Sequence, residues 1–292
     1  MASQDAKVFS QLFSVDSNIY SRQSWCNLLA FILNCAVTYA NNGYGYGKSV
    51  TEISDEYPTI ITPPGWAFAI WGIIFTLEGI FSVWQLCQSQ NNRVLSEVVG
   101  PWWICACLFQ TAWNFIAAGE LFIIAAFALG GISSCLAVMC LQGADAKMTV
   151  AEYILVKVTF GIHAGWTCIA TFLSFNVVAV ARDVSSHGQL ALAIVSLALV
   201  LVIGIFVGVV KRNVAYSLAL GWGVFAISQN QNQTKLLLGD DIASRVEYSS
   251  IFLALFLVLP ALGFELARAC KMVRRGVNDT FTEKLLSDQE DL

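Results

Sequence analysis

Charged residues and histidines are scarce in this sequence of 292 residues. Charged residues make up only 12% of it and there are two histidines, whereas 57% of the residues are hydrophobic and the mean hydropathy is +0.66. Soluble domains contain about 25% charged residues, so this composition excludes an ordinary soluble protein. The net charge is −4 and no basic patch stands out, which excludes nucleic acid as a partner. The sequence therefore predicts a multi-pass membrane protein whose main partner is the lipid bilayer.

Residues suited to catalysis are also few. The sequence contains no cluster of metal-ligand residues, no nucleophile motif and no paired carboxylates, and His187 falls in a predicted loop. Cys105 and Cys107 are two residues apart and would point to different sides of a helix, which disfavours a metal site. We therefore expect no enzyme activity, no metal and no required cofactor.

A secretory signal is not recognisable at the start of the chain. Residues 1–23 are polar and lack the short apolar core and small-residue cleavage site of such a signal. We expect them to form a cytoplasmic segment, with the first apolar run directing the chain to the membrane.

Long apolar runs predict an all-α bundle of about eight membrane spans. A helix needs about 20 residues to cross the hydrocarbon layer. The seventh run is short and the fifth is long, so seven spans are the alternative. Residues 269–292 follow the last run and are expected to be a disordered cytoplasmic tail. The eight runs are 24–41, 64–86, 101–118, 121–142, 153–181, 190–210, 213–228 and 248–268.

Lysine and arginine residues are distributed unevenly between the two sides of the membrane. With an even number of spans, 11 of them fall on one side and 4 on the other. The cytoplasmic side is normally the richer one, so both termini are expected in the cytoplasm. None of the nine cysteines falls in a predicted outer loop, which agrees with this orientation. Asn232 in the outer loop 229–247 starts a glycosylation sequon.

Residues 59–85 form the most distinctive segment. Two consecutive prolines precede Gly65 and Trp66, and an apolar helix with two further tryptophans and Glu78 follows. Prolines suit the first turn of a helix, where no intrahelical donor is needed. A helix that only spanned the bilayer would not need a carboxyl group, so the segment indicates a functional helix.

This segment and three others resemble one family. The loop 48–56 and residues 62–72 are similar to the tryptophan-rich sensory protein family (the TspO, peripheral benzodiazepine receptor or translocator protein group), particularly to its longer, loop-rich branch. The spacing of polar and tryptophan residues in 110–114, and more loosely in 166–176, adds to the resemblance.

The resemblance implies both a fold and a ligand class. It covers residues 24–181, which would form a five-helix bundle around an apolar, tryptophan-lined cavity that opens toward the loop after the first span. Residues 190–268 would add three spans that compact members lack. The family binds flat hydrophobic molecules, so we expect a tetrapyrrole or a sterol-like lipid in the cavity and a binding or sensory function.

The candidate ligand-binding residues are the aromatic and polar side chains of these segments. Some have a second interpretation. A tryptophan near the end of a span, such as Trp66, also suits the membrane interface, and deeper tryptophans are better pocket candidates. The candidates are Pro64, Trp66, Phe68, Trp71, Phe75, Gln110, Trp113, Asn114, His163, Trp166 and Asn176.

The polar candidates leave two possibilities open. Gln110, Trp113 and Asn114 share one helical face, which is either a pocket wall or a set of amide contacts that fasten helices. His163 near the middle of the membrane either forms a hydrogen bond between helices or ligates the iron of a bound tetrapyrrole.

Two further ionisable residues, Glu78 and Lys157, lie within predicted spans. They would either form a buried pair between the second and fifth spans, with Lys157 also able to extend toward the interface, or Glu78 would bind a proton or cation. The second possibility favours a secondary transporter of a small organic solute as the alternative function, although no internal repeat of the transporter kind is visible.

Small residues recur at helical spacing in two of the spans. Gly161 and Gly165 form one such pair, and Gly204 and Gly208 form another. Pairs of this kind allow two helices to approach closely, so they predict tight packing and a possible homodimer face.

Overall fold

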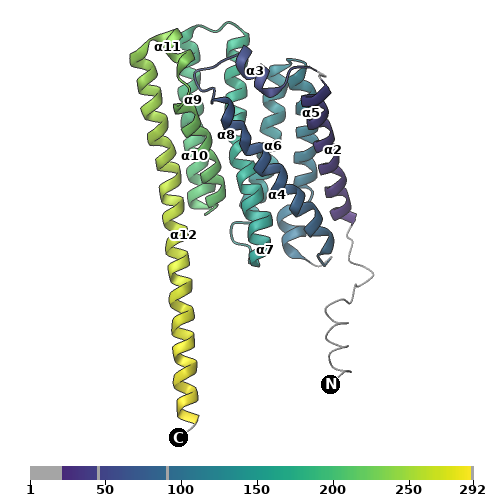
Figure 1. Cartoon of the computed structure of the whole chain (residues 1–292), viewed down its shortest axis with the longest axis vertical. Coiled ribbons are helices and arrows are strands. Elements are labelled where there is room, and N and C mark those ends of the chain that lie inside the picture. Colours follow the sequence, from purple (N-terminus) through teal and green to yellow (C-terminus); the bar gives the residue numbers. More distant parts are fainter. Residues whose placement is uncertain (1–21, 45–46, 90–91, 291–292) are drawn as a thin grey trace.

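The computed structural model describes residues 22–44, 47–89 and 92–290. Within these ranges the chain is helical and contains no strand, which confirms the predicted all-α helical bundle (Figure 1).

Eight helices of at least 15 residues occupy the eight predicted runs. Consecutive long helices run in opposite directions, so the start of the first and the end of the last point toward the same end of the molecule (Figure 1). This path agrees with an even number of spans. The helices are α2 (Arg22–Tyr44), α4 (Ile70–Trp84), α5 (Trp102–Ala118), α6 (Phe122–Gln142), α8 (Thr159–Ala181), α9 (Ser186–Gly204), α10 (Val214–Ser228) and α12 (Asp240–Glu290).

Short helical segments extend or connect the long ones. Two 3-10 helices flank α4, and π-helical turns lie at one end of α8 and of α9. The segments are α3 (Val50–Glu56), η1 (Gly65–Ala69), η2 (Gln85–Cys87), η3 (Val94–Val99), α7 (Val150–Glu152), η4 (Tyr153–Val158), η5 (Ile205–Val210) and α11 (Asn232–Leu238).

Five of the continuous helical stretches are long and apolar enough to cross a membrane, which identifies a multi-pass membrane protein. The remaining long helices, α2, α5 and α10, are more polar or shorter, and α5 and α10 contain 17 and 15 residues. The five stretches are Gly65–Cys87, Phe122–Gln142, Val150–Ala181, Ser186–Val210 and Asp240–Ala267.

The small residues bring helices of this chain together. A Cβ atom added to Gly161 would lie 2.5 Å from Asn213 Oδ1, and one added to Gly165 would lie 2.5 Å from the carbonyl oxygen of Tyr216, so α8 packs closely on α10. Gly204 likewise faces Leu257 of α12.

Gly208 approaches Ser217 of α10 in the same way. Both pairs of glycines therefore serve packing within the chain. Helices of the same chain occupy these faces, as the predicted tight packing requires, and the homodimer stays a prediction.

The last helix is longer than expected. The sequence predicts a span over 248–268 and a disordered tail, but α12 is a single helix from Asp240 to Glu290 that contains Pro260. It packs against α10 at the outer edge of the bundle (Figure 1).

Candidate functional site

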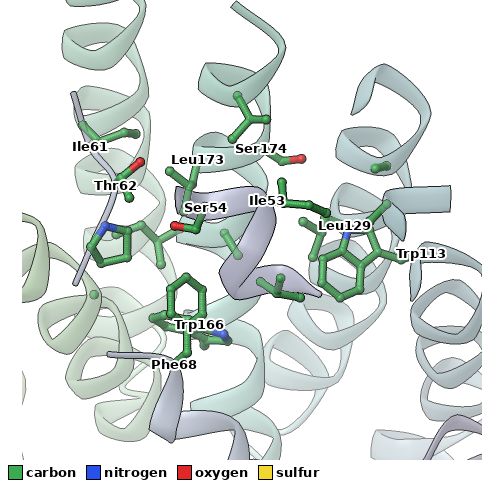
Figure 2. A pocket seen from close by; sticks show the side chains of 18 of the residues that line it. Ile53, Ser54, Ile61, Thr62, Phe68, Trp113, Leu129, Trp166, Leu173 and Ser174 are labelled. Atoms are coloured by element: carbon green, nitrogen blue, oxygen red, sulfur yellow. The ribbon is translucent and has the colours of Figure 1, made fainter. Parts of the chain in front are cut away.

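An apolar cavity lies inside the bundle, between α3, α5, α6, α8, α10 and the turn that leads into α4. We call it the aromatic cavity. The space in it that is free of protein atoms is about 860 Å³, a volume that includes open solvent. The cavity is narrow, because only a small part of this space is far enough from the walls to hold the centre of a water molecule. Its lining contains no charged residue, and the polar side chains there are the hydroxyls of Ser54, Thr62 and Ser174 and the indole N–H groups of the tryptophans (Figure 2).

Tryptophan and phenylalanine side chains form the deep part of the aromatic cavity. Phe68 and Trp71 each meet Trp166 at nearly 90°, with ring centroids 5.8 and 6.4 Å apart. Trp113 of α5 lies on the opposite wall (Figure 2). Edge-to-face contacts hold these rings in fixed orientations. The indole Nε1 of Trp166 is buried and has no hydrogen-bond partner among the described residues.

The short helix α3 forms one wall of the aromatic cavity with Val50, Ile53 and Ser54. Local hydrogen bonds explain why α3 forms: the Ser49 hydroxyl accepts from the amide of Glu52, and the Glu52 carboxylate accepts from the amide of Ser49. This reciprocal cap satisfies two amide donors that a helix start otherwise leaves free.

A charged latch joins both ends of α3 to the turn between α5 and α6. Lys48 pairs with Glu56 and with Glu120, at 2.5 Å in each case, and the Tyr57 hydroxyl donates to Glu120 over 3.1 Å. The Lys48 ammonium and the Tyr57 hydroxyl lower the pKa of Glu120, and the two carboxylates raise the pKa of Lys48. The latch therefore holds α3 over the cavity while Glu120 is ionised.

Helix α10 forms a wall that the sequence did not predict. Gly223 and Ile227 line the aromatic cavity, and Trp222 donates its indole N–H to the carbonyl oxygen of Ala67 over 3.0 Å. Asn230 donates to the carbonyl oxygen of Thr62 over 3.2 Å. The seventh predicted span thus supports the proline-rich turn that enters α4.

Most of the lining residues lie between Val50 and Val177, in the region of the first five spans, and Gly223 and Ile227 of α10 add to them. None of the described lining residues comes from α2. Helix α3 was missed as well, although the capped segment with Val50 and Ile53 three residues apart could have indicated an amphipathic helix.

Four of the predicted ligand-binding residues line the aromatic cavity: Phe68, Trp71, Trp113 and Trp166. Pro63 lines it in place of the predicted Pro64. Trp66 is 46% exposed and meets Trp222 edge-to-face at 5.0 Å, on the outer side of α10.

The predicted amide residues fasten helices instead of lining the aromatic cavity. Asn114 donates to the Thr38 hydroxyl over 3.1 Å and joins α5 to α2. Asn176 donates to the Ser196 hydroxyl over 2.9 Å and joins α8 to α9. Gln110 is also buried outside the lining.

Phe75 lies one helical turn beyond Trp71 and also remains outside the lining. It packs between Trp71 at 5.8 Å and Phe31 of α2 at 6.4 Å, measured between ring centroids. It therefore connects the wall of the cavity to α2.

Glu78 pairs with His163, not with Lys157 as expected. The two side chains are 0% and 2% exposed, and His163 Nδ1 lies 2.7 Å from Glu78 Oε1. Trp103 donates its indole N–H to the same oxygen over 3.3 Å. Lys157 lies in η4, six residues before His163, with its Nζ atom 5.9 Å from the ring centre of Tyr153. Helix α8 therefore presents His163, rather than Lys157, at the depth of Glu78.

The imidazole of His163 lies behind the wall of the aromatic cavity. Its ring meets Trp71 edge-to-face at 5.5 Å, and Trp71 lines the cavity whereas His163 does not. Ligation of an iron inside the cavity by His163 would require Trp71 to move.

Asn232 of the predicted sequon is exposed at the start of α11, while the Thr234 side chain is buried and donates to Gln231 Oε1 over 2.8 Å. Modification of Asn232 stays a prediction.

Comparison with known proteins gives one match. A family model described as TSPO-like protein matches residues 24–262. No curated protein and no solved structure matches the chain. The matched region extends beyond the five-helix region 24–181 through α9 and α10 into α12, so it includes the helix that completes the aromatic cavity. The match covers most of the length of the chain and includes the tryptophan residues that line the aromatic cavity. The chain therefore belongs to the TSPO-like protein family.

Proposed function

We propose that this membrane protein binds a flat, hydrophobic small molecule in the aromatic cavity, and that the ligand is a tetrapyrrole or a sterol-like lipid. The observation that carries the proposal is a narrow cavity with an uncharged lining and five large aromatic side chains on its walls. Such a cavity favours a thin apolar molecule, since charged groups would lose their hydration there without compensation.

The energetics of the walls agree with a planar ligand. Each well-placed aromatic contact adds about 0.5–1.5 kcal/mol beyond the burial of apolar area. Trp71, Trp113 and Trp166 can supply such contacts. The indole N–H of Trp166, which has no partner among the described residues, supports a ligand that also carries one uncharged hydrogen-bond acceptor, such as a hydroxyl or carbonyl oxygen.

Binding, rather than a chemical transformation, is the role that these residues support. The lining offers hydroxyl and indole groups but no histidine, carboxylate or thiol that could act as an acid, a base or a nucleophile. The buried Glu78 and His163 lie behind Trp71.

The experiment is a titration of the detergent-solubilised protein with protoporphyrin IX and, separately, with a fluorescent sterol, following quenching of tryptophan fluorescence. Saturable binding that Trp113→Ala and Trp166→Ala weaken at least tenfold supports the proposal. Trp25→Ala is the matched control, because Trp25 is 44% exposed on α2 and lies outside the cavity.

The two ligand classes are separated by competition between them. If the tetrapyrrole displaces the sterol, and the sterol at a similar concentration does not displace the tetrapyrrole, the ligand belongs to the tetrapyrrole class. The opposite result identifies the sterol class. The proposal is wrong if folded protein binds neither, or if Trp25→Ala weakens binding as much as the cavity variants do.

A secondary transporter remains the second candidate, because one observation favours it. Glu78 and His163 are charged or chargeable side chains buried together among membrane helices, an arrangement common in proton-coupled carriers. Uptake of the ligand into proteoliposomes that depends on a proton gradient, and that Glu78→Gln abolishes without loss of binding, would favour transport over binding alone.

A further inference from the structure

A line of polar side chains runs along the inner face of α2. Asn27, Asn34 and Thr38 are separated by seven and four residues and therefore share one face of the helix. Asn27 donates to Gln85 Oε1 over 2.8 Å, and Thr38 accepts from Asn114. Asn34 is fully buried between them. Together with Gln110, Glu78 and His163, the residues Asn27, Asn34 and Gln85 make up what we call the polar seam.

Many polar atoms of the polar seam have no hydrogen-bond partner among the described residues. Buried polar groups in proteins are normally hydrogen-bonded, and in a bilayer an unsatisfied group costs several kcal/mol. Internal water commonly satisfies such groups when several of them converge. The atoms are Asn27 Oδ1, Asn34 Oδ1 and Nδ2, Gln85 Nε2, Gln110 Oε1, Glu78 Oε2 and His163 Nε2.

The contacts of the Glu78–His163 pair favour one arrangement of its protons. Glu78 Oε1 faces both the indole N–H of Trp103 and His163 Nδ1, which favours a carboxylate with the imidazole protonated at Nδ1. The position left to gain or lose a proton is His163 Nε2. With a proton there the pair is neutral overall, and without it the pair carries one negative charge.

Other titratable groups face the pair from two neighbouring helices. The thiols of Cys35 on α2 and Cys107 on α5 lie within electrostatic range of Glu78. On α4 itself, the Ser82 hydroxyl donates to the carbonyl oxygen of Glu78. None of these described neighbours is a cation, so the imidazolium of His163 is the positive group that balances the Glu78 carboxylate.

The pair is in contact with the wall of the aromatic cavity. The His163 ring lies 5.5 Å from Trp71, within the distance at which a cation is attracted to an aromatic ring. A molecule packed against Trp71 changes the surroundings of the imidazolium. Any such coupling is reciprocal, so a ligand that changes the proton affinity has an affinity that depends on pH by the same factor.

We propose that the Glu78–His163 pair is a proton-binding site inside the membrane, which exchanges one proton at His163 Nε2 with water in the polar seam. We further infer that its protonation is coupled to occupancy of the aromatic cavity through Trp71. This coupling rests on the ligand-binding function proposed above, whereas proton binding by the free protein does not.

Nitrogen NMR of the full chain, labelled with ¹⁵N-histidine and reconstituted in lipid nanodiscs, tests the site directly. Only two histidines are present, and His187 lies on the first turn of α9, away from Glu78, so it serves as an internal reference. We expect His163 Nε2 to gain and lose one proton reversibly as the pH is changed, while Nδ1 keeps its proton throughout. Assignment is made with His187→Ala.

Two outcomes decide the proton site. In folded Glu78→Gln the imidazole should be neutral at the pH at which the wild-type imidazole is half protonated, because the carboxylate that stabilises the cation is gone. If this variant does not fold, the wild-type titration alone decides. The proposal is overturned if His163 keeps one protonation state over the whole pH range in which the protein stays folded.

Addition of saturating protoporphyrin IX tests the coupling. We expect the midpoint of His163 to move while that of His187 stays in place. Bound protoporphyrin that leaves both midpoints unchanged overturns the coupling. Protoporphyrin that does not bind counts against the proposed ligand, and the titration of the free protein still decides the proton site.

Discussion

The aromatic cavity and the polar seam are neighbouring regions of the same bundle, but their side chains differ in chemistry. The cavity has an uncharged lining of rings and aliphatic side chains, whereas the seam collects amides, a carboxylate and an imidazole between α2, α4, α5 and α8. Trp71 and His163 meet at the boundary. In a bilayer the hydrophobic effect does not drive helices together, because lipid tails are as apolar as the side chains. Close packing and polar contacts therefore determine which helices associate. Polar residues therefore mark helix contacts as readily as they mark a ligand site.

The largest effect is expected from breaking the Glu78–His163 pair. Glu78→Leu leaves His163 buried without its partner, and the loss of one member of a buried pair destabilises proteins by about 3–5 kcal/mol. The double variant Glu78→Leu/His163→Leu removes both polar groups and should recover most of this loss. Thermal unfolding in detergent measures both. A double variant as unstable as the single one would show that the pair is not the source of the effect.

Narrowing the aromatic cavity should weaken ligand binding about tenfold. A Cβ atom added to Gly223 would lie 3.0 Å from Ile169 and 3.6 Å from Trp166, so Gly223→Ala should displace a wall side chain into the cavity. Gly263→Ala on α12 is the matched control, because nothing lies within 4 Å of the added atom. Affinity is measured by tryptophan quenching with protoporphyrin IX. Equal effects of the two variants would contradict the assignment of the cavity as the ligand site.

Loosening the latch should speed ligand release with little loss of stability. Lys48→Met removes the cation between Glu56 and Glu120, and exposed ion pairs contribute only about 0–1 kcal/mol. Because α3 forms one wall of the cavity, stopped-flow measurement should show a faster dissociation rate. Lys235→Met breaks an exposed pair with Asp240 away from the cavity and should leave the rate unchanged. If both variants release ligand at the wild-type rate, the latch does not hold α3 over the cavity.

The same latch predicts a pH dependence of ligand release. The pKa of Glu120 is lowered in the folded protein, mainly by Lys48, so its contribution is present above the ordinary pKa of about 4.3 and is lost as the pH falls through the lower folded value. Dissociation should therefore accelerate below about pH 4 in the wild type. Lys48→Met should lack this acceleration, and an identical acid response in the variant would assign it to another group.

The smallest effect is expected from the contact between α8 and α9. Ser196→Ala removes the hydroxyl that accepts from Asn176, while Asn176 keeps its bond to the carbonyl oxygen of Phe172. Interhelical hydrogen bonds in membranes contribute about 0.6 kcal/mol on average. Thermal unfolding should shift slightly, and ligand affinity should not change. A change in affinity would place this contact in the binding site after all.

Much of the architecture follows from local patterns. Apolar runs predict the long helices, because a helix is the segment that satisfies its own backbone in lipid. The tryptophans of the cavity were predicted at Trp71, Trp113 and Trp166, since rings deep in a span suit a pocket. Local pattern also indicated that Glu78 needs a partner in the protein.

The sequence by itself determined the class of this protein, its helical segments and the aromatic character of its cavity. Composition and helical periodicity can be read from one segment without knowledge of the segments that it contacts. The tertiary structure alone decided which segments meet. Periodicity shows that a face of a helix is polar, but an amide on it is satisfied equally by a neighbouring helix or by a ligand. The tertiary structure pairs Glu78 with His163, 85 residues away in the sequence. It also packs the paired glycines against other helices of the same chain. The seventh span likewise contributes Gly223 and Ile227 to the cavity. The sequence of this span does not show this contact, because it depends on how the helices pack in three dimensions.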